Sequence, residues 1–361
     1  MEKVKTATVT WINYNNCGTY LQAYALQHVV QSLGYENHIL NDAPHFIDPR
    51  PVWRKALSWL WHKLVARPPK VMRRVNGCYA RFSKDWLKID RQTADLARVS
   101  NRYDTFLCGS DQIWSPIIKP VNPYFFLYFT DKKKVAYAPS LGSTTASDEW
   151  RQVVQPLLQQ FAHLSVREQQ GAALLSEMLH RDVPAVVDPT LLLTADDWQP
   201  LCAERVVPDG GKYLFCYLLT NNPVYLDVAR RYAGQHGLEL VLMGLHPEYE
   251  GQAGHVLWGG PSEFLSAVRH ADVVMTDSFH ATVFSILFKK QFYTFQRFKA
   301  GAWNNQNSRL ENLLGKLAIK GRFVTDGNFD NVPPIDYDKA LALLEAERAA
   351  SLRYLSSSLK D

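Results

Sequence analysis

The chain has 361 residues, of which 47% are hydrophobic and 21% are charged. This composition is ordinary for a globular protein and excludes a disordered chain, and the length predicts two domains rather than one. The net charge of +5 is unevenly distributed. Residues 50–91 hold 12 of the 40 Lys and Arg residues but 2 of the 35 acids (+10), which leaves 28 basic and 33 acidic residues (−5) elsewhere.

The N-terminus lacks the apolar stretch and small-residue cleavage site of a signal peptide, and the chain has no run of about 18 apolar residues that could span a membrane. The five cysteines are scattered and form no C-x-x-C pair, which argues against structural zinc and against a disulfide framework. We therefore expect a protein of the reducing cytoplasm. No metal site is expected, because no cluster of side chains has metal-ligand spacing.

The first half of the chain predicts alternating strands and helices. Strands are expected at residues 6–12, 35–40, 103–108, 134–138, 163–167 and 183–187. Helices are expected at residues 19–33, where Gly34 ends the helix, at 169–179, and over most of 50–89 with a break at Pro68 and Pro69. The opening is therefore a βαβ unit whose helix N-terminus faces the polar loop at residues 13–18.

The pattern restarts after residues 198–211, a loose stretch with two prolines and two adjacent glycines. Strands are expected at residues 213–219 and 238–243, and helices at 224–233, 262–270, 307–317 and 336–359. Residues 272–295 predict a buried strand, a tight turn, an apolar helix and a second buried strand. We expect an α/β fold of two Rossmann-like domains facing a cleft, at residues 1–197 and 198–335, with a C-terminal helix in 336–361 that packs back across the junction.

The start of the first predicted helix is one candidate site. Gly18 lets the backbone turn and approach a ligand, and Thr19 can cap the helix. Asn16 and Gln22 flank them and are expected at the cleft. A single glycine is not the G-x-G-x-x-G fingerprint, so NAD binding gains no support. A well-capped helix without a ligand explains the same residues equally well.

Two further candidates follow predicted strands. Asp111 and Gln112 come directly after a buried strand, where either could hold a sugar hydroxyl or form an Asx-type cap. Arg167 ends a short strand, and its forked guanidinium suits a phosphate or carboxylate. A surface pair between Arg167 and Glu168 is the alternative interpretation, and such pairs contribute little to stability.

His280 is the strongest candidate. It falls at the carboxyl end of a predicted strand and in the first turn of a helix, where open α/β sheets bind ligands and where the helix dipole favours an anion. An imidazole, whose ordinary pKa is near neutral, indicates a catalytic role in this position. The alternative is a structural histidine held by hydrogen bonds. Arg309 and Lys299 offer additional cations nearby in the sequence.

Taken together in this order, the motifs resemble those of the polysaccharide pyruvyl transferase family. The resemblance rests on residues 16–27, 109–114, 136–140, 165–168, 187–193, 276–285 and 307–309. These matches span roughly residues 5–325. Cys17 stands where the family is expected to carry an aromatic residue, and Ala281 where glycine is common.

The resemblance implies a fold like that of GT-B glycosyltransferases, with the N-terminal domain on the acceptor side and the C-terminal domain on the donor side. It also implies transfer of a pyruvyl group from phosphoenolpyruvate to two hydroxyls of one sugar, as a ketal. No cofactor is expected beyond this donor substrate. Arg167 and His280 would lie in the site with Ser278, and Lys299 or Arg309 would supply the second cation.

The basic segment at residues 50–91 also contains tryptophans, namely Trp53, Trp59, Trp61 and Trp86. Aromatic residues among cations suit the interface of an anionic membrane, as expected for an enzyme whose acceptor glycan is linked to a lipid. The protein would then be cytoplasmic and bind the inner face of the plasma membrane. An ordinary helix with a solvated basic face, or a nucleic-acid patch, are the alternatives, and no nucleic-acid partner is expected.

Two other functions remain open from the sequence. One is a GT-B glycosyltransferase that uses a nucleotide sugar, which would also place basic residues beside a diphosphate. The other is a non-catalytic module that binds a glycan or an anion.

Overall fold

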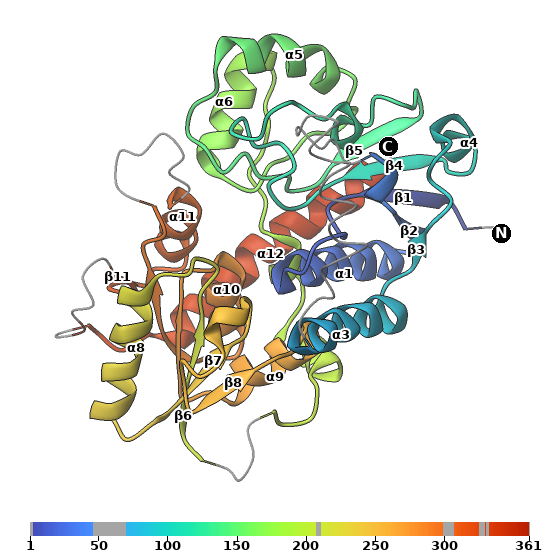
Figure 1. Ribbon diagram of the computed structural model, residues 1–361. Helices are drawn as coiled ribbons and strands as arrows, with labels where there is room; N and C mark the ends of the chain where they lie inside the picture. Colours follow the sequence, from blue (N-terminus) through green and yellow to red (C-terminus); the bar gives the residue numbers. More distant parts are fainter. Residues whose placement is uncertain are drawn as a thin grey trace.

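The computed structural model describes residues 3–45, 70–206, 211–298, 307–324, 329 and 332–360. These residues form two sheets with helices packed around them, one sheet in each lobe of the molecule (Figure 1). All strand pairs within the described residues are parallel. The fold is α/β, with two Rossmann-like domains facing a cleft in the GT-B manner.

The N-terminal sheet has the strand order β3-β2-β1-β4-β5. Its strands are β1 (Lys5–Val9), β2 (Glu36–Leu40), β3 (Ile89–Asp90), β4 (Thr105–Cys108) and β5 (Lys133–Ala136). The helices of this lobe are α1 (Cys17–Ser32), α3 (Lys70–Trp86), α4 (Leu96–Ser100), α5 (Asp148–Leu158) and α6 (Gln169–Leu179). Short 3₁₀ turns are η1 (Ala43–His45), η2 (Pro123–Phe126) and η3 (Pro189–Leu192).

The C-terminal sheet has the strand order β11-β10-β9-β6-β7-β8. Its strands are β6 (Tyr213–Tyr217), β7 (Glu239–Met243), β8 (His255–Leu257), β9 (Val273–Thr276), β10 (Gln291–Phe295) and β11 (Phe323–Val324). The helices are α8 (Pro223–Gln235), α9 (Pro261–His270), α10 (Phe279–Leu287), α11 (Ser308–Lys316) and α12 (Tyr337–Lys360). The connection between the sheets holds α7 (Ala195–Trp198) and η4 (Gln199–Leu201), and η6 (Pro247–Tyr249) follows β7.

Both sheets reverse their strand order at one point, between β1 and β4 in the first sheet and between β9 and β6 in the second. Strands such as β6 and β9 are buried along their whole length, because helices cover both faces of a parallel sheet. In such sheets the crevice beyond the carboxyl ends of the strands at the reversal point is where ligands bind. The two reversal points therefore define where a site between the lobes is expected.

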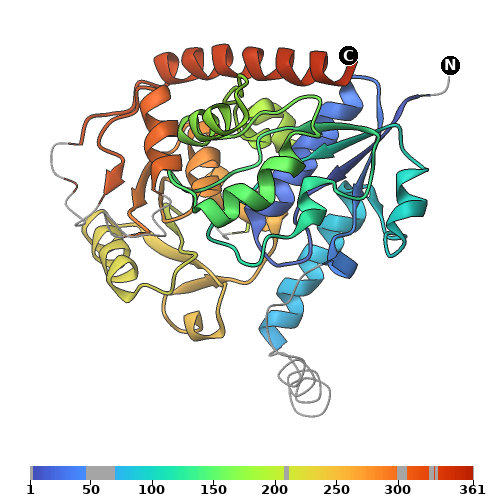
Figure 2. The ribbon, with the colours of Figure 1, turned by 90° about the horizontal axis from the view of Figure 1, so that it is seen from above.

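The last helix, α12, contacts both lobes. Arg348 Nε donates to the carbonyl of Leu191 at 2.8 Å, and Tyr354 OH donates to the carbonyl of Ala136 at 3.1 Å. At the other end of the helix, Tyr337 OH donates to the carbonyl of Lys290. Figure 2 shows α12 lying along one side of both lobes. The domain limits at residues 197 and 335 stay a prediction, and the first of them falls inside α7.

Two expected strands are absent from the ladders of the described residues. At 163–167 and 183–187 the structure has isolated bridges, between Val135 and His163 and between Val166 and Ala185. Pro184 has no N–H to continue a ladder, and the N–H of Arg167 bonds to the carbonyl of Pro139 instead. The expected break at Pro68 and Pro69 lies outside the described residues.

Candidate active site

A small cavity opens between the two lobes, at the carboxyl ends of the sheets. The N-terminal lobe contributes Tyr14, Asn16, Asp111 and Gln112. The C-terminal lobe contributes Leu219, Asp277, Ser278, Phe279, His280, Arg297, Phe298, Asn307, Arg309 and Leu310. We call this space the site cavity.

Helix N-termini border the site cavity. Asn16 caps α1, with Oδ1 accepting from the N–H of Thr19 at 3.3 Å, and Ser278 caps α10, with Oγ accepting from the N–H of Ala281 at 3.4 Å. Asn307 stands immediately before α11. The first turn of a helix has backbone N–H groups without intrahelical partners and the positive end of the dipole, so this arrangement favours a bound anion.

His280 is held tightly in the first turn of α10. Its ring packs against Gly18 in the first turn of α1, so closely that a β-carbon at Gly18 would lie 2.0 Å from His280 Nδ1. The residue is 7% exposed. His280 Nε2 lies 3.6 Å from Asp188 Oδ2 and has no closer hydrogen-bond partner among the described residues. The imidazole is thus fixed between a helix N-terminus and a carboxylate.

Asp188 connects His280 to Arg167. Its Oδ2 accepts from Arg167 Nη1 at 2.6 Å, and its Oδ1 accepts from the hydroxyl of Thr190 at 2.6 Å. Burial alone would raise the pKa of Asp188, but the nearby His280 and Arg167 hold that pKa well below its usual range. Asp188 is therefore ionised at neutral pH, and its carboxylate faces the imidazole of His280.

Arg167 lies behind Phe279 rather than on the wall of the site cavity. Its Cζ is 4.5 Å from the centre of the Phe279 ring, and with Asp188 it borders a second small cavity on the far side of that ring. Burial acts to lower the pKa of Arg167, yet the carboxylates of Asp188 and Glu168 raise it above its usual value. Its Nη2 is buried and makes no hydrogen bond within the described residues.

Arg309 borders both cavities, with its Cζ 5.9 Å from the centre of the Phe279 ring. Burial, together with the positive charge of Arg167, lowers the pKa of Arg309 to about 10. The side chain is still charged at neutral pH. The carboxylates of Glu168 and Asp111 offset part of the repulsion between Arg167 and Arg309, and an anionic ligand would offset more of it.

The opposite wall carries a hydroxyl and carboxylate network. Thr19 Oγ1 donates to Asp111 Oδ2 at 2.6 Å, and the hydroxyl of Tyr14 lies 2.8 Å from Thr19 Oγ1 and 3.5 Å from Asp111 Oδ2. Burial, and next the charge of Asp111, raise the pKa of Tyr14 well above its usual value. Tyr14, Asp111 and Gln112 therefore present neutral donors and an acceptor to the cavity.

Comparison with known families identifies the chain. A sequence model of polysaccharide pyruvyl transferases matches residues 16–297. The chain belongs to the polysaccharide pyruvyl transferase family. This confirms the resemblance seen in the sequence and assigns the protein to transferases of polysaccharide biosynthesis. A search of curated protein sequences finds no match.

Solved structures resemble this family member in fold. UDP-GlcNAc 2-epimerase from Methanocaldococcus jannaschii superposes with a TM-score of 0.51 at 11% identity, covering 95% of this chain and 92% of that one. A Staphylococcus aureus MnaA–UDP co-structure has a TM-score of 0.51 at 14% identity, covering 98% and 91% of the two chains. At these identities the likeness describes the fold alone.

Most of the predicted site residues meet around one cavity in this pyruvyl transferase family member. The wall holds Asn16, Asp111, Gln112, Ser278, His280 and Arg309. Thr19 lies directly behind Asp111, and the α1 cap expected at Thr19 is formed by Asn16, so the helix begins at Cys17. Lys299 lies outside the described residues, so its predicted role stays a prediction.

Gln22 is placed differently from the prediction. It is fully buried behind the site cavity, where Nε2 donates to Thr10 Oγ1 at 2.9 Å and Oε1 accepts from the N–H of Ser110 at 3.0 Å. These bonds fasten the loop after β4 to β1 and α1. The expectation that Gln22 lines the cleft was wrong, because its side-chain amide forms hydrogen bonds with Thr10 and with the backbone N–H of Ser110.

The sequence reasoning missed Asp188, Tyr14 and Arg297 as site residues. Arg297 borders the site cavity, and its Nε is buried without a hydrogen bond to any described residue. It is the first basic residue after β10, a signal that could have placed it ahead of Lys299. Asp188 lies in one of the matching motifs, residues 187–193, and in the structure it also caps η3.

Cys17 and Ala281, where the sequence departs from the family pattern, do not line the site cavity. Cys17 is buried, with Sγ 3.1 Å from the hydroxyl of Tyr79 in α3, and burial raises the pKa of its thiol to about 12. Ala281 is likewise buried in α10.

The basic segment is described from residue 70 onwards, so Trp53, Trp59 and Trp61 lie outside the described residues. Helix α3 turns its apolar side inwards, where Tyr79 packs on Tyr20 and Trp86 on Tyr24. Its exposed basic residues are Lys70, Arg73, Arg74, Arg81 and Lys84. This half of the segment is therefore a helix of the N-terminal domain whose basic side chains face outwards.

In the parts of the chain that the structure describes, no helix is long and apolar enough to cross a membrane. Within the same residues, no group of three or more His, Cys, Asp or Glu side chains is placed to hold a metal ion.

Proposed function

We propose that the protein transfers a pyruvyl group from phosphoenolpyruvate to two hydroxyls of one sugar, as a cyclic ketal, during assembly of a cell-surface polysaccharide. The observation that carries the proposal is the pairing of His280 with Asp188 at a cavity bordered by Arg297 and Arg309. The sugar would belong to a glycan on a lipid carrier. The chain's membership of the polysaccharide pyruvyl transferase family supports this proposed reaction.

The cavity's charge suits the proposed donor. Phosphoenolpyruvate carries a carboxylate and a phosphate close together, and guanidinium groups bind such oxygens without losing their protons near neutral pH. Arg297 and Arg309 would contact the donor directly, with Ser278 and the N-terminus of α10 beside them. Arg167 would add positive potential from behind Phe279 and hold Asp188 in place.

The proposed reaction begins with a proton. Protonated His280 gives its proton to C3 of the donor, which makes C2 a cation, and Asp188 stabilises the imidazolium beforehand. The first sugar hydroxyl then forms a bond to C2 and loses its proton to the now neutral imidazole. The C2–O bond to phosphate breaks, and the second hydroxyl adds to C2 while its proton passes to the departing phosphate. The products are the ketal, whose C3 is a methyl group, and inorganic phosphate.

The acceptor sugar would lie against the N-terminal wall. Tyr14, Asn16, Asp111 and Gln112 supply hydroxyl, amide and carboxylate groups there, which are the groups that bind sugar hydroxyls. Peripheral contact of the basic face of α3 with an anionic membrane would bring a lipid-linked glycan to this wall. This contact would take place at the cytoplasmic face of the plasma membrane.

The test is an assay of purified protein with phosphoenolpyruvate and a panel of lipid-linked glycans. Phosphate release together with a glycan whose mass increases by one pyruvyl group would support the proposal. Release of a nucleoside diphosphate from a nucleotide sugar would instead indicate a glycosyltransferase. Glycan binding without turnover of either donor would indicate a binding module.

A further inference from the structure

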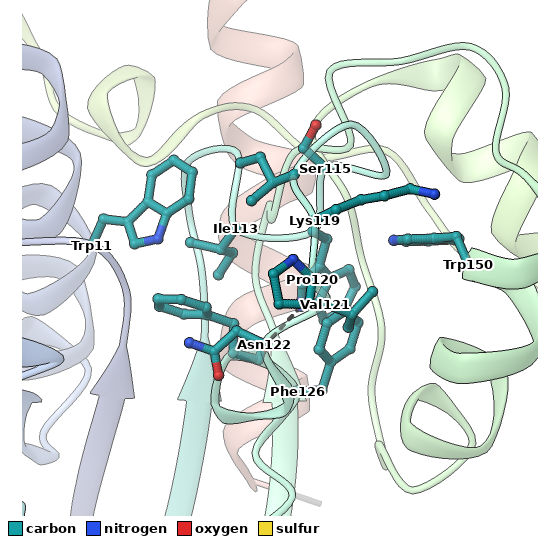
Figure 3. A pocket seen from close by; sticks show the side chains of 12 residues that line it. Trp11, Ile113, Ser115, Lys119, Pro120, Val121, Asn122, Phe126 and Trp150 are labelled. Carbon is teal, nitrogen blue, oxygen red and sulfur yellow. Dashed lines mark hydrogen bonds between the residues drawn. The ribbon is translucent and has the colours of Figure 1, made fainter. Parts of the chain in front are cut away.

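A further cavity, larger than the site cavity, lies in the N-terminal lobe (Figure 3). Its volume is about 270 Å³, close to the lower end of small-molecule pockets at about 300 Å³. Aromatic side chains dominate its wall, namely Trp11, Trp114, Phe125, Phe126 and Trp150. We call it the aromatic cavity.

Trp11 and Trp150 stand on opposite sides of the aromatic cavity, and the indole nitrogen of Trp150 points towards it (Figure 3). Trp150 is 3% exposed as a whole residue, and its indole N–H faces the cavity rather than a hydrogen-bond acceptor among the described residues (Figure 3). The indole of Trp114 differs, because its Nε1 donates to the carbonyl of Phe125 at 2.9 Å. An indole N–H that faces a cavity can donate to an acceptor atom on a ligand, so the Trp150 donor suits a ligand with oxygen atoms.

The aromatic cavity neighbours the site cavity. The ring of Trp11 lies 5.9 Å from the ring of Tyr14 in an edge-to-face contact, and Tyr14 borders the site cavity. On the outer side, the hollow extends past Lys119 and Trp150 to Val153, which is 45% exposed. The aromatic cavity therefore lies beside the N-terminal wall of the site cavity and opens towards the surface near Val153.

We propose that the aromatic cavity binds a second sugar ring of the acceptor glycan, next to the sugar that receives the pyruvyl group. This rests on the proposed function. The C–H face of a pyranose packs on an indole, while its hydroxyl oxygens accept hydrogen bonds, so one sugar ring satisfies both the apolar wall and the Trp150 N–H. A polyprenyl chain would match the apolar wall but leave that N–H unpaired, which costs free energy in a buried site.

The experiment compares Trp11→Ala and Trp150→Phe with wild type and with Tyr128→Ala. Tyr128 is a matched aromatic control, because it is 53% exposed and does not border the cavity. Binding is measured on an array of bacterial surface oligosaccharides and, separately, by calorimetric titration with phosphoenolpyruvate. Trp150→Phe keeps an aromatic ring and removes only the donor, and thermal unfolding checks that each variant is folded.

The wild type and Tyr128→Ala are expected to bind the same glycans of two or more sugars. Trp11→Ala should weaken this binding about tenfold and Trp150→Phe about threefold, since the first loses a stacking surface and the second one hydrogen bond. Phosphoenolpyruvate should bind all variants equally. Failure of the proposed function would give a different result. The wild type would release no phosphate from phosphoenolpyruvate, while the differences in glycan binding between wild type and variants would remain.

Three results would overturn the inference. The first is unchanged glycan affinity in both folded variants, and the second is a wild type that binds no oligosaccharide on the array. The third is binding of farnesyl phosphate, a short polyprenyl phosphate, in the aromatic cavity. Its affinity would then fall in both variants, and glycans would not compete with it for binding.

Discussion

The Nδ1 atom of His280 lies 2.0 Å from the position that a β-carbon on Gly18 would occupy. The two residues are on different lobes, Gly18 in α1 and His280 in α10, so this contact sets where the imidazole stands relative to the N-terminal wall. Any side chain at position 18 would have to move the ring.

Gly18→Ala should therefore reduce activity by at least about 10²-fold, because small displacements of a reacting group are costly to the rate. Overpacking should also lower the free energy of unfolding, by about 1–3 kcal/mol. The measurement is phosphate release from phosphoenolpyruvate with a glycan acceptor, together with urea unfolding.

Gly77→Ala is the matched control for that variant. Gly77 lies in α3, and a β-carbon there would meet nothing within 4 Å. Alanine in a helix interior should raise the free energy of unfolding by about 0.5–1 kcal/mol and leave activity unchanged. Normal activity in Gly18→Ala would show that the His280 ring does not need its observed position.

Asp188→Asn should reduce activity and destabilise the fold by about 3–5 kcal/mol, since it leaves Arg167 buried without its closest carboxylate. The pKa of Asp188 is depressed in the folded state, so its contribution to stability is present above the unfolded pKa, about 3.9, and is lost only as the pH falls below it. Urea unfolding at pH 5 and pH 8 should show the same deficit for the variant. A deficit that disappears by pH 5 would contradict this assignment.

Asp42 should make the protein less stable as the pH rises. Burial raises the pKa of Asp42 to about 6, so between about pH 4 and pH 6 the folded state binds a proton that the unfolded state has released. Stability from this group is thus present at low pH and falls as the pH rises through 6. Asp42→Asn should be more stable than wild type at pH 7, and the difference should shrink towards pH 4. Urea unfolding across this range measures it, and a constant difference would refute the expectation.

Arg309→Lys should raise the KM for phosphoenolpyruvate about 10- to 100-fold, because an ammonium cannot replace a guanidinium that binds two oxygens at once. The kcat should fall less than the KM rises. Arg230→Lys is the control, since Arg230 is a solvent-exposed residue paired with Asp227 in α8. Steady-state kinetics at varied donor concentration decides, and an unchanged KM for Arg309→Lys would remove Arg309 from the donor site.

The basic face of α3 should bind anionic vesicles at low salt and release them at high salt, as screened surface charges do. Arg73→Glu combined with Arg74→Glu should reduce the bound fraction several-fold without changing thermal unfolding, because both side chains are exposed. Pelleting with phosphatidylserine vesicles, and with neutral vesicles as the control, measures this. Equal pelleting of the variant and the wild type would argue against α3 as the contact.

Much of the fold could be predicted from local patterns. Alternating apolar strands and amphipathic helices indicated two Rossmann-like domains, and the position of His280 at a strand end and helix start is what the structure has. Local signals predict such features because they depend on residues close together in the chain.

The rest of the site depends on contacts between distant residues. Nothing near Gly18 in the sequence indicates that it packs on His280, and nothing near Gln22 indicates that its amide satisfies the backbone of Ser110. Asp188 both caps η3 and faces His280, so its local role as a cap concealed its role in the site. The expected strand at 183–187 failed because Pro184 interrupts the ladder.

The central claim is that His280 delivers a proton to C3 of phosphoenolpyruvate while a sugar takes up the pyruvyl group. Its most direct test is the reaction in heavy water, with the product glycan read by mass spectrometry. Wild type should give a ketal whose methyl group carries one deuterium, and folded His280→Gln should give almost no product. Near-normal product formation by His280→Gln, or a glycan that gains a sugar rather than a pyruvyl group, would contradict the claim.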